Sequence, residues 1–220
     1  MPLPILFDLE LAHGRALAVT MHAGADVSDA ILADEEKAYA RGLTDRRRRT
    51  WTAGRVALRL ALAREGIAHG PLLATSRGAP LLPEGVAGSV SHKDHVAVAL
   101  VARERRAALG VDVELDAPRP YDVAHHVLTD DERAEMAHEA PDERQRSVLL
   151  RFSAKESIYK AVDPFVKRYV GFKEAYVAPR SDGSARAELH LRPDEGHFDV
   201  EVRWLARDGL FVTTARIQPT

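Results

Sequence analysis

The alternation of apolar and polar positions near the amino end of the chain predicts strands followed by helices. Residues 3–22 alternate loosely, which indicates one or two edge strands. Residues 28–41 carry a helical pattern rich in Asp and Glu. A longer helix is expected directly afterwards, with Thr44 as its N-cap and Gly66 as its end.

The middle of the chain contains its most apolar run. Residues 96–101 are all apolar, which is typical of a strand buried on both faces. Residues 108–116 predict a second strand, and the segment 102–106, charged at four of its five positions, is expected to form a hairpin between the two. A break rich in proline follows. We expect a boundary between two subdomains near residue 107.

Helices and then strands are predicted for the remainder of the chain. Residues 121–160 carry helical spacing over a length that suits two or more helices. The carboxyl-terminal part is typical of a meander whose last two strands are joined by a turn at Arg207–Gly209. Its strands are expected at residues 187–192, 198–206 and 210–217.

Composition narrows the classes of function. With 220 residues, 45% of them hydrophobic and 29% charged, the chain can bury the core of one large domain or two small ones. A formal charge of −2 gives no overall field that would attract nucleic acid or an anionic membrane. The absence of cysteine leaves only oxygen or imidazole as metal ligands. The amino terminus lacks a basic signal-peptide region, and no segment approaches about 18 consecutive apolar residues, so we expect a cytoplasmic protein.

Asp112 and Glu114 stand two residues apart in a predicted strand. The strand period of two places both carboxylates on one face and the neighbouring valines on the other. Two like charges about 7 Å apart are unfavourable unless a cation lies between them, and hard oxygen ligands suit Mg²⁺. The alternative is a solvated face of an edge strand, and the pair alone does not exclude it.

Glu156 lies on an apolar face of the helix predicted before residue 160. The side chains that share this face, within an arc of about 80°, are Leu149, Phe152, Glu156 and Lys160. Burial of Glu156 is costly unless a metal or an ion pair neutralises it. Lys160 is four residues further on, so an ordinary Glu–Lys helix pair is the alternative to a metal site.

Arginines follow one face of the helix predicted after Thr44. Arg48, Arg55 and Arg59 fall within about 40° on that face, and such a stripe can hold phosphate groups through bidentate contacts. A solvated helix face is the alternative. A nucleic-acid contact by residues 46–49 is disfavoured, because four arginines in a nearly neutral chain are not interleaved with aromatic residues.

Two of these segments together resemble the paired signature of Sfp-type 4′-phosphopantetheinyl transferases. Gly110–Glu114 precedes Phe152–Lys160, and the combination is far more specific than either part. Further segments are similar to the enterobactin synthase component D branch, namely Arg47–Arg55, Gly88–His92 and Lys167–Phe172. The resemblance spans roughly residues 35–178.

The chain departs from the family pattern at two positions. Phe152 stands where the family frequently has Trp, and this substitution keeps an aromatic ring. Ala74 stands where a basic residue is often found ahead of the Gly-Pro segment, so one phosphate contact of the family is not implied here.

The resemblance implies an α+β fold of two similar α/β subdomains related by a pseudo-twofold axis, with coenzyme A in the cleft between them. Residues 1–107 would form the subdomain on the adenine and 3′-phosphate side. Residues 108–220 would carry the metal and the catalytic residues.

The resemblance also implies a reaction. The 4′-phosphopantetheine of coenzyme A is moved to a serine of an apo acyl or peptidyl carrier protein, and 3′,5′-ADP is released. Such transfer supports the synthesis of siderophores, nonribosomal peptides or polyketides. Mg²⁺, with Mn²⁺ as an alternative, is expected on Asp112, Glu114 and Glu156. Glu156 is the expected base, and Lys160 is expected to stabilise the departing phosphate.

Binding residues are implied in the same way. The residues expected at the 3′-phosphate, the pyrophosphate or the departing ADP are Arg47, Arg48, Arg55, Arg77, Ser91, His92, Lys155 and Lys160. An acidic helix of the carrier is expected to meet Lys167, Arg168 and Lys173. A monomer without nucleic-acid or membrane partners is expected.

His125–Asp130 indicates a different function. It is similar to the HHxxxD of condensation-type acyltransferases, in which the second His is a general base. The Gly expected next is Asp131, so we interpret the segment as a turn in which Thr129 caps a helix. A coenzyme A-binding module without transfer is the remaining alternative, and the intact acidic residues favour the enzyme.

Overall fold

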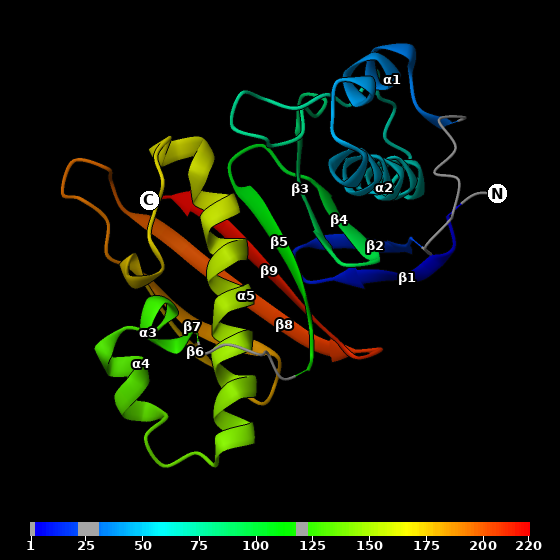
Figure 1. Cartoon of the computed structure of the whole chain (residues 1–220). Helices are drawn as coiled ribbons and strands as arrows, with labels where there is room; N and C mark the ends of the chain where they lie inside the picture. Colours follow the sequence, from blue (N-terminus) through cyan, green and yellow to red (C-terminus); the bar gives the residue numbers. More distant parts are fainter. Residues whose placement is uncertain (1–2, 22–30, 118–122) are drawn as a thin grey trace. The chain divides into compact units, whose positions relative to one another are not determined.

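The computed structural model describes residues 3–21, 31–117 and 123–220 of the chain (Figure 1). These residues belong to two units, Met1–Arg105 and Arg106–Thr220. Each unit contains an antiparallel sheet and a long helix. The α+β fold class expected from the sequence is confirmed. None of the described helices has the length and apolar character needed to cross a membrane.

The first unit is a four-stranded sheet with a long helix packed on it. Its elements are β1 (Ile5–Leu11), β2 (Gly14–Thr20), α1 (Asp34–Arg41), α2 (Asp45–Arg64), β3 (Val86–Lys93) and β4 (Val96–Arg103). The strand order is β1-β2-β4-β3, all antiparallel. Helix α2 packs on β2, β3 and β4, and α1 packs on α2.

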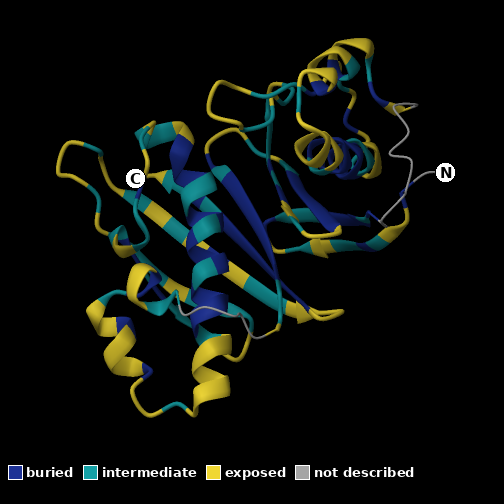
Figure 2. Cartoon of the chain, viewed as in Figure 1, coloured by how far each residue is buried: buried dark blue, intermediate teal, exposed yellow. Residues whose placement is uncertain are grey.

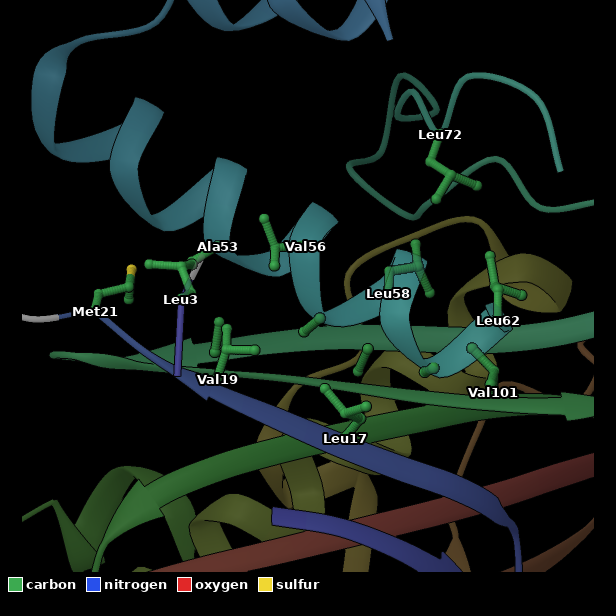
Figure 3. Packing of buried hydrophobic residues seen from close by; sticks show 14 of the residues in the cluster. Leu3, Leu17, Val19, Met21, Ala53, Val56, Leu58, Leu62, Leu72 and Val101 are labelled. Carbon is green, nitrogen blue, oxygen red and sulfur yellow. The ribbon is translucent and has the colours of Figure 1, made fainter. Parts of the chain in front are cut away.

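Apolar side chains of α2 and of the sheet form the core of this unit. Leu58 and Leu62 of α2 and Leu17 of β2 belong to this cluster (Figure 3). The apolar run at residues 96–101 is buried along its whole length, as predicted for a strand covered on both faces. Thr44 is the N-cap residue of α2, which confirms the predicted start of that helix.

The second unit is a five-stranded antiparallel sheet with helix α5 packed on one face. Its elements are β5 (Ala108–Leu115), α3 (Ala124–Val127), α4 (Asp130–Glu135), α5 (Pro141–Val166), η2 (Phe172–Glu174), β6 (Ala175–Pro179), β7 (Ser184–Leu189), β8 (Phe198–Arg207) and β9 (Leu210–Pro219). The strand order is β5-β9-β8-β7-β6. The predicted meander is therefore confirmed for β7, β8 and β9, and β6 adds a strand that the sequence pattern did not indicate.

The turn between β8 and β9 has the predicted form. Asp208 and Gly209 both adopt positive φ, 51° and 72°, as a two-residue type I′ hairpin requires. This turn fixes the register of the β8–β9 pair.

The predicted hairpin between β4 and β5 is wrong. Both edges of β4 are already paired, with β2 on one side and β3 on the other. Strand β5 belongs to the other sheet and pairs with β9, which follows it at the far end of the sequence. A pairing between such distant segments leaves no signal in local periodicity.

Helix α5 lies directly against β5 (Figure 1). A Cβ added to Gly110 would stand 1.8 Å from the backbone oxygen of Ser157, so no side chain fits between strand and helix at this point. Figure 2 shows both the middle of α5 and β5 as largely buried. The two signature segments of the sequence are therefore in contact, one on β5 and the other on α5.

Candidate active site

The two carboxylates of β5 lie on the strand face that also carries Gly110, and this face packs on α5. Asp112 and Glu114 are 5% and 7% exposed. Strand β5 is an edge strand, as the alternative interpretation required, but α5 covers the carboxylates. A solvated face is therefore not what the structure shows.

Asp112 is held by side chains of both neighbouring elements. Ser153 Oγ of α5 donates to Asp112 Oδ2 at 2.9 Å. Thr213 of β9, which is the register partner of Asp112, lies with its Oγ1 2.9 Å from Ser153 Oγ and also donates to Ser153 O. Ser153 and Thr213 are both fully buried, so this network fixes the orientation of the Asp112 carboxylate.

Lys160 connects α5 to the same strand. Its Nζ donates to Asp112 Oδ1 at 2.8 Å and to Val111 O at 2.9 Å. An ordinary helix pair would place the ammonium group along α5, whereas these contacts reach across to β5. The structure thus brings together two residues that the sequence assigned to metal binding and to phosphate stabilisation.

Glu156 is half-buried on α5 and lies within electrostatic range of the other three charged groups. Burial raises the pKa of the Glu156 carboxyl, the negative charges of Asp112 and Glu114 raise it further, and Lys160 opposes this shift. Asp112, Glu114 and Glu156 supply three carboxylates against the one ammonium group of Lys160, so ionised carboxylates would leave negative charge in excess here. A bound cation would relieve that excess.

Mg²⁺ is a metal whose preferences suit these groups. It takes oxygen ligands, often only one or two carboxylates together with water and phosphate oxygens. In residues 3–21, 31–117 and 123–220, no three Asp, Glu or His side chains converge closely enough to form a complete metal site. The donor set nevertheless fits the metal, because it offers three carboxylates, and the ammonium group of Lys160 bonds to Asp112 among them.

In the first unit, two of the expected coenzyme A contacts meet. Arg47 Nη1 at the start of α2 lies 3.0 Å from His92 Nε2 on β3, and both side chains are exposed. Ser91, which precedes His92, is buried. Arg77 is exposed and lies in a turn in which its backbone N–H donates to Thr75 Oγ1 at 3.3 Å.

Arg55 lies in the interior of the first unit. It is 3% exposed, its guanidinium stacks 4.7 Å from the ring centre of Trp51, and its Nη2 donates to Leu73 O. Burial lowers the pKa of Arg55 to about 10, and the negative charge of Glu36 opposes this shift. Among the described residues, no hydrogen-bond acceptor reaches the buried Arg55 Nε.

The arginines of the stripe predicted on α2 differ in their surroundings. Arg48 pairs with Asp45 one turn earlier on the surface of the helix. Arg59 donates to Glu36, a carboxylate with no exposed surface, at 2.6 Å. Because Arg55 is buried as well, the helix face turns toward the interior after its first turns.

Lys155 is also internal. It is 2% exposed and bonds to Glu132 Oε2 and to Val127 O. Burial lowers the pKa of its ammonium group, and Glu132 opposes this shift. This position does not support the expected contact of Lys155 with coenzyme A.

The segment that resembled an acyltransferase motif was expected to form a turn, but its histidines belong to the short helix α3. His125 and His126 are exposed on α3. Thr129 Oγ1 accepts a hydrogen bond from the Glu132 backbone N–H, so Thr129 caps α4 as predicted. A cavity of about 540 Å³ lies beside His125, but none of the residues expected in the site lines it.

The expected carrier contacts are only partly available. Arg168 forms bidentate ion pairs with Glu174 and with Glu195, so its charge is already neutralised. Lys167 ends α5 in the left-handed conformation, and Lys173 lies in η2. The structure therefore gives Arg168 a role in fixing this loop.

Four buried polar residues around these sites were missed in the sequence analysis: Glu36, Glu132, Ser153 and Thr213. Only Glu132 carried a signal, since it follows Thr129 at the spacing of a capping box. The side-chain partners of the other three come from distant segments.

Two family models match the chain. The model of the 4′-phosphopantetheinyl transferase N-terminal domain matches residues 34–102, and that of the 4′-phosphopantetheinyl transferase superfamily matches residues 108–214.

Curated relatives are similar over most of the chain. The 4′-phosphopantetheinyl transferase Svp of Streptomyces mobaraensis is 37% identical over 91% of this chain and 85% of its own. The 4′-phosphopantetheinyl transferase Npt of Nocardia iowensis is 33% identical over 81% and 86%, respectively. Enterobactin synthase component D of Salmonella typhimurium is 31% identical over 73% and 68%.

Proposed function

Because this chain belongs to the 4′-phosphopantetheinyl transferase superfamily and is an enzyme of that class, we propose that it moves 4′-phosphopantetheine from coenzyme A to a serine of an apo acyl or peptidyl carrier protein. The observation that carries the proposal is the contact between the two signature segments. Lys160 Nζ of α5 lies 2.8 Å from Asp112 Oδ1 of β5, with Glu156 close enough to be affected by both charges.

In the proposed reaction, the serine oxygen of the carrier forms a bond to the β-phosphorus of coenzyme A. The bond from that phosphorus to the bridging oxygen breaks, and 3′,5′-ADP leaves with the electron pair. Glu156 accepts the serine proton, because it is the half-buried carboxylate of this group on α5. Lys160 places positive charge beside the departing phosphate.

The proposed metal ligands are Asp112, Glu114 and Glu156. When bound, Mg²⁺ supplies positive charge to the pyrophosphate oxygens, and Mn²⁺ is the proposed substitute. Ser153 and Thr213 orient Asp112 for this role. Because Ser153 holds Oδ2 of Asp112, the other oxygen, Oδ1, stays directed toward Lys160.

Coenzyme A is proposed to contact the first unit through the exposed pair Arg47 and His92. Arg48 and Arg77 are further exposed cations, and Ser91 is the buried residue beside His92. Arg55 reaches an anion through its buried Nε, which the described residues leave without an acceptor. Lys155 is left out of this set.

The proposed partners follow from the same chemistry. The acceptor is a carrier protein, and relatives named enterobactin synthase component D make a carrier of siderophore assembly the first one to test, beside nonribosomal peptide and polyketide carriers. A monomeric enzyme in the cytoplasm completes the proposal. The alternative of a coenzyme A-binding module without transfer finds no support in the relatives, which are named as transferases.

The test is an incubation of the purified chain with coenzyme A, Mg²⁺ and an apo carrier, followed by intact mass measurement of the carrier. We expect the mass to rise by one phosphopantetheine. EDTA should abolish the gain, and Mg²⁺ or Mn²⁺ should restore it. A carrier whose acceptor serine is replaced by alanine is the matched control. Binding of coenzyme A without any gain in carrier mass would support the binding module instead.

A further inference from the structure

The buried ion pair between Lys155 and Glu132 ties four parts of the second unit together. Lys155 Nζ on α5 donates to Glu132 Oε2 on α4 at 2.7 Å and to Val127 O of α3 at 2.8 Å. Glu132 Oε1 accepts the backbone N–H of Val177 on β6 at 2.7 Å, and its Oε2 also accepts the Thr129 N–H at 2.8 Å. Every acceptor oxygen of Glu132 is therefore engaged, and α5 is fastened to α3, α4 and β6.

The first unit contains the same arrangement. Glu36 of α1 is fully buried, its Oε2 accepts the Ala33 N–H at 2.7 Å, and its Oε1 accepts the Leu72 N–H at 2.6 Å. Arg59 of α2 supplies the cation at 2.6 Å. A capping glutamate of a short helix thus binds both a remote backbone N–H and a cation of the long helix in each unit.

The positions of the paired residues correspond as well. Glu36 and Glu132 each occupy the third position of their helix, and each accepts the backbone N–H of the residue that precedes the helix. Arg59 and Lys155 each follow the first residue of their long helix by fourteen positions.

The catalytic residues proposed for this chain are all in the second unit, so the first unit shows the arrangement apart from them. The residue after Arg59 is Leu60, which packs against the hydrophobic core. The residue after Lys155 is Glu156, the proposed base. The arrangement therefore serves to fix a long helix, and in the second unit the helix so fixed carries the carboxylate of the site.

We propose that Lys155 is a positioning residue. Its ion pair with Glu132 fixes the position of α5 and thereby the position of the Glu156 carboxylate. This inference rests on the proposed function of Glu156. It replaces a contact between Lys155 and coenzyme A.

Paired substitutions separate the two roles. Removing one partner of a buried ion pair leaves the other charge uncompensated, whereas removing both charges relieves that cost. A positioning defect is therefore repaired by a second substitution at Glu132. If Lys155 instead contacts the substrate, a change at Glu132 does not restore turnover. The positive charge of Lys155 is then missing from both the single and the double variant.

The experiment compares Lys155→Met, Glu132→Gln and the double variant by thermal unfolding and by steady-state transfer to an apo carrier. We expect each single variant to unfold at a lower temperature than the parent. Its turnover should fall by about 10- to 100-fold with a smaller change in KM, as for a displaced catalytic group. The double variant should regain the melting temperature and recover turnover to within about 3-fold of the parent. Lys160→Met, combined with Glu132→Gln, is the control and should not recover.

Recovery of the melting temperature without recovery of turnover in the double variant would overturn the proposal, because Lys155 would then act on the substrate. If Lys155→Met does not fold, the turnover of Glu132→Gln alone distinguishes the two roles. A substrate contact by Lys155 predicts unchanged turnover in this variant, and a positioning pair predicts a loss of turnover. If the parent protein transfers nothing, the proposed function is refuted. The ion pair is still tested in that case, because recovery of the melting temperature in the double variant is measured without a transfer assay.

Discussion

Arg47 and Arg55 lie on one helix but differ in their contact with solvent. Arg47 is exposed beside His92, and Arg55 is buried over Trp51. An exposed arginine can be removed with little effect on the core, while removal of Arg55 also removes packing. Arg47 is therefore the cleaner probe of the proposed 3′-phosphate contact.

We expect Arg47→Ala to weaken the binding of coenzyme A by about 1.5–3 kcal/mol, the range of hydrogen bonds to charged groups. Binding of dephospho-coenzyme A should change much less, because that ligand lacks the 3′-phosphate. Isothermal titration with both ligands measures the difference. Arg49→Ala is the matched control, since Arg49 is exposed on the same helix about 200° round from Arg47. Equal losses for the two ligands would place Arg47 elsewhere.

Glu156 and Lys160 lie one turn apart on α5 and should fail in different ways when replaced. Glu156→Gln keeps size but removes the charge, so turnover should fall by at least about 10²-fold, and the concentration of Mg²⁺ needed for half-maximal rate should rise. Lys160→Ala should lower turnover with little change in apparent coenzyme A binding, because its interaction strengthens as charge builds on the departing oxygen.

Titration of the rate with Mg²⁺ and with coenzyme A distinguishes the two variants. Thermal unfolding controls for lost folding, since Lys160 also bonds to Asp112 and Val111. Identical kinetic defects in both variants would contradict the separate roles.

At the scale of elements, the site depends on how closely α5 approaches β5. We expect Gly110→Ala to cost about 3 kcal/mol of stability and most of the transfer activity, because the added Cβ meets the backbone of Ser157 and displaces the helix from Asp112. Gly70→Ala is the matched control, since nothing lies within 4 Å of a Cβ added there. Urea denaturation and the transfer assay measure the two effects, and an unaffected Gly110→Ala protein would show that the helix does not need this close approach.

The loop after α5 is expected to respond to acid. Hydrogen bonds from Arg168 lower the pKa of Glu195 to about 2 and also lower the pKa of Glu174. A carboxyl whose folded pKa lies below its unfolded value of about 4.3 contributes stability in full above that value. This contribution is lost as the pH falls toward about 2.

Arg168→Ala should therefore lower the free energy of unfolding by a constant amount above about pH 5, and the difference from the parent should shrink below about pH 4. Urea denaturation between pH 2 and pH 7, on both proteins, measures this difference. A difference that grows toward low pH would contradict the assignment.

At the scale of the whole molecule, the two units share a buried glutamate paired with a cation of the long helix. The two cations differ in how far water reaches them. The side chain of Lys155 is 1% exposed and that of Arg59 is 18% exposed. Glu132→Gln leaves a lysine charge that water does not reach, so we expect it to cost about 3–5 kcal/mol. Glu36→Gln should cost less, because Arg59 remains partly solvated. Chemical denaturation of the two variants measures the order, and a larger loss for Glu36→Gln would contradict the explanation by solvation.

The sequence by itself determined the features that depend on neighbouring residues. The N-cap at Thr44, the buried run at residues 96–101, the cap at Thr129 and the turn at Asp208 and Gly209 each follow from side chains within one or two turns. Spacing on β5 and α5 also indicated the acidic pair and the charged helix.

Only the tertiary structure decided which distant segments meet. The pairing of β5 with β9 brings Thr213 to Asp112, and the capping glutamate Glu132 meets Lys155, which turns that lysine from an expected ligand contact into an internal one. The surroundings of the arginine stripe on α2 were decided in the same way, because Glu36 pairs with Arg59 in the interior. Periodicity tells which face of a helix carries a charge, but whether that face meets water or a buried carboxylate depends on packing between remote parts of the chain.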